Sequence, residues 1–113
     1  MKKYDIEEYI TENGETPFSE WAEGLKDKTA QRKVSQRIDR ASLGNFGDYK
    51  SIKDSKGIFE MREHYGSGYR IFYSIVENKI VLLLAGSTKK DQNKIITKAK
   101  EYLADYNRRK DHE

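Results

Sequence analysis

Residues 57–99 read GIFEMREHYGSGYRIFYSIVENKIVLLLAGSTKKDQNKIITKA, and they contain three apolar segments of strand length. The segments lie at 58–65, 69–76 and 79–86 and are rich in β-branched and aromatic residues. Gly66-Ser67-Gly68 and Glu77-Asn78 separate them, and both connections have the length of hairpin turns. We therefore predict three consecutive antiparallel strands, followed by a helix over 91–107.

The first 25 residues predict a strand and a short helix. Residues 4–10 read as a strand whose inward-facing side chains are Tyr4, Ile6 and Ile10. A helix over 17–25 follows, with Thr16 as its N-cap. Pro17 stands at the first helical position, where its missing N–H does no harm.

A second, longer helix is predicted over 28–43, with Asp27 as its N-cap and Gly44 as its C′ glycine. Its apolar stripe consists of Ala30, Val34, Ile38 and Ala41. A loop over 46–53 leads into a short edge strand, and the tail 108–113 is expected to fray. The predicted class is α+β: an N-terminal strand, a helical hairpin packed on an antiparallel sheet, and a C-terminal helix.

The composition predicts one small domain over residues 1–113 in a soluble, cytoplasmic protein. Apolar residues make up 35% and charged residues 36% of the chain, so the core must be concentrated in a few segments. Cysteine is absent, which excludes a disulfide framework and a thiol nucleophile. The longest apolar run, 80–85, is far shorter than a membrane span, and the N-terminus lacks the apolar region of a signal peptide.

The charge is distributed unevenly along the chain. The net charge is +3, yet the first 23 residues hold two lysines against seven acids, so the rest carries +8. An acidic opening on a basic body favours a polyanion, and RNA above all, as the ligand of the later part. The alternative is that many of these charges only solvate helix faces.

Arg62 and Arg70 stand out because both occur in apolar strand context. One face of the sheet should pack on the helices, so we expect the face with both arginines to be partly exposed and concave. The flanking cations are Lys50, Lys53 and Lys56 before this surface and Lys89 and Lys90 after it. A structural ion pair of Arg62 with Glu60 or Glu77 is the competing interpretation.

The sequence offers little for metal or serine chemistry. It has no His/Asp/Glu cluster with ligand spacing and no serine in a nucleophile elbow, so neither a metal nor a cofactor is expected. Attack of an RNA 2′-OH on its neighbouring phosphate remains available, since arginines stabilise the equatorial oxygens. Positive neighbours lower a lysine's proton affinity, which makes Lys89 or Lys53 the candidate base. One of Tyr65, Tyr69 and Tyr73 is a candidate for base stacking.

Three short motifs occur in a fixed order: Glu60-x-Arg62, Gly68-Tyr69-Arg70 and Gly86-x-x-Lys89-x-x-Gln92. With them, the chain resembles the addiction-module killer proteins, HigB-like members of the RelE/ParE toxin superfamily, over nearly its entire length. The resemblance implies a microbial RNase-like fold with a curved antiparallel sheet. The chain departs from the family pattern at Ser87, Thr88 and Ile95.

The resemblance also implies a function. It implies a toxin of a type II toxin–antitoxin pair that cleaves mRNA on the ribosome, without a cofactor. Its partner would be a helix-turn-helix antitoxin, and it would reach operator DNA only through that complex. The implied catalytic residues are Arg62, Arg70 and Lys89, and the implied RNA-binding residues are Lys53, His64, Tyr69, Lys90 and Gln92. The alternatives are a ParE-like inhibitor of DNA gyrase and a toxin-like half of a repressor complex.

Overall fold

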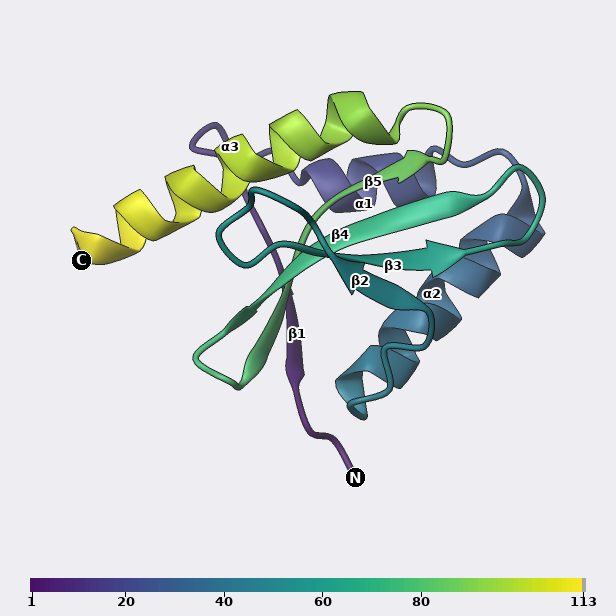
Figure 1. Cartoon of the computed structure of the whole chain (residues 1–113), viewed down its shortest axis with the longest axis horizontal. Helices are drawn as coiled ribbons and strands as arrows, with labels where there is room; N and C mark the ends of the chain where they lie inside the picture. The colour runs from purple at the N-terminus through teal and green to yellow at the C-terminus, as the bar shows by residue number, and fades with distance from the viewer. Residues whose placement is uncertain (113) are drawn as a thin grey trace.

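The computed structural model describes residues 1–112, and its eight elements form a five-stranded sheet covered by helices on both faces (Figure 1). In chain order these are β1 (Asp5–Glu8), α1 (Pro17–Glu23), α2 (Lys28–Ser42), β2 (Tyr49–Ser51), β3 (Phe59–Glu63), β4 (Tyr69–Val76), β5 (Ile80–Thr88) and α3 (Gln92–Asp111). The strand order is β1-β5-β4-β3-β2. Strand β1 runs parallel to β5, and the other neighbours are antiparallel. The predicted α+β class and the order of its elements are confirmed.

The hairpin between β4 and β5 shows how local sequence sets the register. Glu77 and Asn78 both adopt positive φ, at 55° and 58°, which is the geometry of a type I′ turn. An irregularity in the pairing between Phe72 and Tyr73 leaves Leu84 without a partner on β4. Such a bulge bends the strands, which agrees with the curvature predicted for the sheet.

The two faces of the sheet carry two separate apolar clusters. On one face, α1 and α2 pack on β3, β4 and β5 through Phe18, Val34, Met61, Ile71 and Tyr73. On the other, α3 packs through Ala99 and Leu103 on Phe72, Leu82 and Leu84. We predicted a partly exposed, concave surface on the arginine-bearing face, but α3 covers much of that face.

The predicted N-cap positions, Thr16 and Asp27, and the C′ glycine, Gly44, are confirmed, whereas the predicted end of the last helix is wrong. The Asp27 carboxylate accepts hydrogen bonds from the backbone N–H groups of Thr29 and Ala30, and Gly44 adopts φ +89° after α2. The Thr16 side chain makes no capping hydrogen bond; its own N–H donates to the Glu20 carboxylate instead.

The error concerns the C-terminus, since α3 continues to Asp111 instead of fraying after residue 107. Arg109 lies over the Tyr9 ring and pairs with Asp105 at 2.8 Å, and Lys110 pairs with Glu77 at 3.3 Å. These contacts hold the last turns against the body of the protein. The final residue, 113, is outside the described residues.

Strand β1 is shorter than predicted; Tyr4 and Ile6 pack against the core as predicted, but Ile10 does not. Ile10 is 50% exposed, whereas Tyr9 is 4% exposed. The Tyr9 ring stacks on Tyr102, and its hydroxyl donates to Asp105 at 2.6 Å. Because the strand ends at Glu8, its alternation no longer governs the residues that follow. No helix within residues 1–112 combines the length and the apolar character needed to span a membrane.

Candidate nucleic-acid interface

Arg62 and Arg70 lie directly opposite each other on β3 and β4. Ser87 on β5 is the next residue across the sheet from Arg70. On the other side, the Arg62 backbone N–H donates to the Asp48 carbonyl at 2.8 Å. The fold thus brings the two predicted arginines into one row across the sheet, near the N-terminus of α3.

Arg70 is buried, with 6% of its surface exposed. Its Nε donates to Gln92 Oε1 at 3.1 Å, and its Nη1 donates to the Tyr69 carbonyl at 3.2 Å. Gln92 is the first residue of α3, so this helix fixes the guanidinium from above. The prediction of an exposed Arg70 is wrong, since α3 covers the strand at this point.

Glu60 stands between the two arginines and is the main residue that the sequence interpretation undervalued. It is 4% exposed, and its carboxylate lies 3.4 Å from Arg62 Nη2 and 3.4 Å from Arg70 Nε. The ion pair with Arg62 was one of our alternatives and is confirmed. The second pair, with Arg70, depends on the register of β3 against β4. The motif Glu60-x-Arg62 was the available signal, because alternate strand residues share a face.

Arg62 is the arginine whose donors are incompletely used. Its side chain is 28% exposed, and its Nε has no hydrogen-bond partner in the described part of the chain. The same holds for Glu60 Oε2. A guanidinium presents a planar fork of donors that matches a carboxylate or a phosphate. Arg62 Nε is itself buried, so a ligand can contact only the exposed part of this side chain, whereas Arg70 is buried and hydrogen-bonded within the protein.

The predicted lysines are all exposed. Lys89 follows β5, and its N–H donates to the Gly68 carbonyl at 3.1 Å. Its side chain runs beside Gly68, at 3.4 Å from the position that a Cβ would take there. Lys89 and its neighbour Lys90 thus stand at the β3–β4 turn, while Lys53 lies in the β2–β3 loop.

His64 and Asp48 form a pair at the β2 side of the row. A hydrogen bond of 2.6 Å joins His64 Nε2 and Asp48 Oδ2. This bond, aided by the positive charge of Arg62, holds the pKa of the Asp48 carboxyl below its usual value. The exposed His64 ring is therefore oriented by a carboxylate beside Arg62.

Tyr69 is not brought to this interface. It is 8% exposed, and its ring centroid lies 6.3 Å from that of Trp21, a residue of α1. The ring thus lies on the opposite face of the sheet from Arg70, as strand alternation requires. Tyr73 is likewise buried on that face, stacked on Phe46 and Phe59.

Arg37 of α2 supports the row from behind and was missed at the sequence level. It is 6% exposed, and its Nη2 donates to the carbonyls of Phe46 at 2.8 Å and Asp48 at 3.2 Å. Its Nη1 donates to the Arg62 carbonyl, and Glu63 lies 3.9 Å away. Burial lowers the pKa of Arg37. Its place on the apolar stripe, seven residues after Ala30, was the signal that could have identified it.

Within residues 1–112, no three His, Asp or Glu side chains gather closely enough to hold a metal ion.

Comparison with known proteins places this arrangement in the RelE fold class. The chain resembles the free-state structure of a mutant E. coli toxin RelE in which two arginines are replaced by alanine. The TM-score is 0.64 at 14% sequence identity, over 88% of this chain and 95% of that one. A likeness at this identity establishes the fold, and it confirms the RelE-like architecture predicted from the sequence.

The chain belongs to the family described as "Phage derived protein Gp49-like (DUF891)", whose profile matches residues 20–107. It is also 43% identical over 83 residues to an uncharacterized protein of Haemophilus influenzae, which covers 74% of this chain and 82% of that protein. The matched region 20–107 includes the arginine row, Glu60 and the Lys89 loop.

Proposed function

We propose that this protein is the toxin of a type II toxin–antitoxin pair and arrests growth by cleaving mRNA on the ribosome. The observation that carries the proposal is the arginine row, in which the partly exposed side chain of Arg62 lies beside the fixed charge of Arg70. The RelE fold and the Gp49-like family support it. The narrower HigB-like assignment rests on the sequence motifs and is part of the proposal.

The proposed chemistry is transesterification within the RNA. The 2′-oxygen forms a bond to phosphorus, the bond from phosphorus to the 5′-oxygen breaks, and a 2′,3′-cyclic phosphate and a 5′-hydroxyl result. Arg62 contacts the phosphate oxygens, on which negative charge builds up in the transition state. Arg70 adds a fixed positive charge from below and holds Glu60, which in turn orients Arg62.

The proton transfers need a base and an acid within reach of the phosphate. We assign Lys89 as the base or as a further phosphate contact, since it stands at the turn that joins β3 to β4. The His64–Asp48 pair lies on the other side of Arg62 and is placed to contact RNA or to supply a proton. Lys53, Lys90 and Gln92 complete the proposed RNA-binding set. The ribosome would supply further orientation, because positioning alone can lower a barrier substantially.

The proposed protein partner is a helix-turn-helix antitoxin. The exposed lysines and the partly exposed Arg62 would attract an acidic segment that neutralises the toxin. In this scheme, operator DNA is bound only through the antitoxin complex.

The first test is a pulse of expression followed by mapping of mRNA 5′ ends, with and without translation initiation blocked. We expect cuts within translated frames that vanish when ribosomes are kept off the message. Arg62→Ala should abolish both the cuts and the growth arrest. Arg40→Ala is the matched control, because Arg40 is exposed on α2 and takes no part in the row.

Two results would contradict the proposal. One is growth arrest by a stable, soluble Arg62→Ala protein at the level of the wild type. The other is intact mRNA together with failing DNA replication, which would favour a gyrase inhibitor of the ParE kind.

A further inference from the structure

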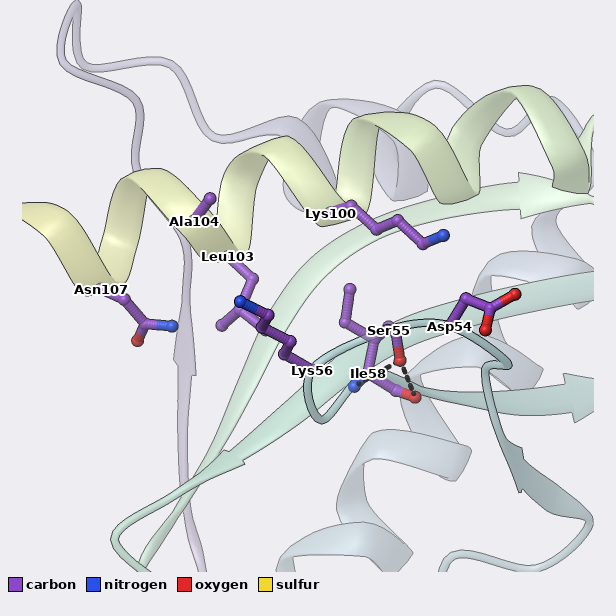
Figure 2. A pocket seen from close by; sticks show the side chains of 8 residues that line it. All are labelled: Asp54, Ser55, Lys56, Ile58, Lys100, Leu103, Ala104 and Asn107. Carbon is purple, nitrogen blue, oxygen red and sulfur yellow. Dashed lines mark hydrogen bonds between the residues drawn. The ribbon is translucent and has the colours of Figure 1, made fainter.

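A pocket of about 270 Å³ lies between the β2–β3 loop and the C-terminal half of α3 (Figure 2). Ile58 and Leu103 form its apolar floor, and both belong to the core, at 1% and 5% exposed. The polar residues around its mouth are Asp54, Lys56, Lys100 and Asn107. The pocket is thus apolar inside and charged at its rim, as small ligand sites usually are.

The loop that forms one wall is held in place by its own hydrogen bonds. The Ser55 hydroxyl donates to the Ile52 carbonyl at 2.7 Å and accepts from the Ile58 N–H at 3.2 Å. The Ile52 N–H donates to the Ile58 carbonyl at 2.8 Å. Packing of Leu103 against the same core fixes the opposite wall. The pocket is therefore formed before any ligand arrives.

The pocket lies on the same side of the sheet as the arginine row. Glu60 and Arg62 are alternate residues of β3, and Ile58 directly precedes that strand and belongs to the core cluster on the face that α3 covers. At ~3.3 Å per residue, Ile58 and Arg62 are about 13 Å apart along the strand. On the other wall, α3 leads from Gln92 beside Arg70 to Lys100 at the pocket. A strand of RNA bound at Arg62 can therefore reach the pocket within a few nucleotides.

Unpaired lysines follow the same path. Lys50 lies opposite Glu60 on β2, Lys53 is in the loop, and Lys56 and Lys100 line the pocket. Among residues 1–112 none of these four takes part in an ion pair. Asp54 is the single acid that lines the pocket. Such a row of cations repels itself and is complementary to a polyanion.

We propose that this pocket binds one unpaired nucleobase of the RNA, and that Lys56 and Lys100 contact the phosphates on either side of it. This inference rests on the proposed function. Proteins that bind single-stranded RNA place splayed-out bases on apolar or aromatic surfaces beside a basic track. Asp54 and Asn107 provide an acceptor and an amide for the edge of the base.

The size and shape of the pocket favour a base over a peptide. Pockets for drug-sized ligands measure ~300–1,000 Å³, and this one is smaller, at about 270 Å³. A docked amphipathic helix needs a hydrophobic groove that accepts its side chains at i, i+4 and i+7. The space between α3 and the β2–β3 loop is a single small pocket instead. A single flat ring fits that description.

The test uses the full chain and a short, fluorescent single-stranded RNA with 2′-O-methyl groups throughout, which cannot be cut because its nucleophile is blocked. Bases are removed one position at a time, and affinity is measured by anisotropy. We expect one abasic position to weaken binding about tenfold, the loss typical of one docked base. Ala104→Phe should remove this position dependence, because Ala104 lines the pocket and a phenyl ring takes up much of its small volume.

A matched pair of variants tests the lysine contact. Lys100→Gln should reduce the slope of log affinity against log salt by ~0.7, the value for one phosphate of a single strand. Lys98→Gln carries the same charge change at an exposed position of α3 that does not line the pocket, and it should leave the slope unchanged. Equal slopes for the two variants would overturn the assignment of Lys100.

The outcomes separate this inference from the proposed function. Binding that needs Arg62 but shows a flat abasic scan, with Ala104→Phe equal to wild type, would overturn the base pocket alone. Binding that is unchanged in Arg62→Gln would overturn the role of the arginine row. Poly-glutamate that competes as well as RNA of equal charge would also overturn the pocket, since it would show recognition of charge only.

Discussion

Glu60→Gln should weaken the fold and strengthen RNA binding at the same time. The carboxylate is 4% exposed and lies 3.4 Å from both Arg62 and Arg70. At that distance, a unit-charge pair attracts by ~5 kcal/mol at an effective dielectric constant of ~20, before desolvation is counted. Glutamine keeps the shape of the side chain but removes the charge that both guanidinium groups require.

The net cost is smaller than this Coulomb energy. Removing one partner of a buried ion pair costs ~3–5 kcal/mol. The lower end, ~3 kcal/mol, applies here, because Arg62 is 28% exposed and can turn toward water. For a protein of this size the loss corresponds to a fall of roughly 10 °C in Tm, and urea unfolding measures it directly.

The effect on RNA has the opposite sign. The cluster of Glu60, Arg62 and Arg70 changes from +1 to +2, and Arg62 loses its internal acceptor. We expect the 2′-O-methyl RNA to bind about fivefold more tightly, which is ~1 kcal/mol for one added contact. The salt slope should become steeper by ~0.7.

Glu63→Gln is the control for net charge, since Glu63 pairs with Arg37 on the opposite face of β3. It should leave the RNA affinity unchanged. A Glu60→Gln protein that is as stable as wild type, or that binds RNA more weakly when folded, would refute the idea that Glu60 competes for Arg62.

Three further predictions concern the scaffold. Gly86→Ala should lower the free energy of unfolding by ~1–3 kcal/mol through overpacking, because a Cβ there would lie 2.0 Å from the Trp21 ring. Adding Trp21→Leu should recover part of that loss in a urea titration, and no recovery would exclude overpacking as the cause. Arg37→Met should lower the free energy of unfolding by ~3 kcal/mol, since the carbonyls of Phe46, Asp48 and Arg62 lose their donor; an unchanged urea midpoint would contradict this. Burial and the Asp105 hydrogen bond raise the pKa of Tyr9 to about 12, so its contribution to stability is complete below the unfolded tyrosine pKa of ~10 and is lost as the pH rises toward the folded value. Tyr9→Phe should flatten the stability profile above pH ~10 relative to wild type, and parallel profiles would show that Tyr9 does not contribute.

The sequence by itself determined the elements and most of their ends. Apolar periodicity located α2, β3, β4 and β5, because their repeat reports which face is buried. Asp27, Gly44 and the Glu77-Asn78 turn were readable because each satisfies a local backbone requirement. The order of the sequence motifs also predicted the RelE-like fold.

Only the tertiary structure decided which charged residues are free. The register of β3 against β4 sets Arg62 opposite Arg70, and the packing of α3 buries Arg70 and leaves Arg62 partly open. The extension of α3 to Asp111 likewise depends on contacts between distant parts of the chain. Tyr9 lies about a hundred residues before its partner in α3, and Glu77 lies about thirty residues before its own. Local propensity contains no information on such partners, since burial and ion pairing arise between segments that only the folded chain brings together.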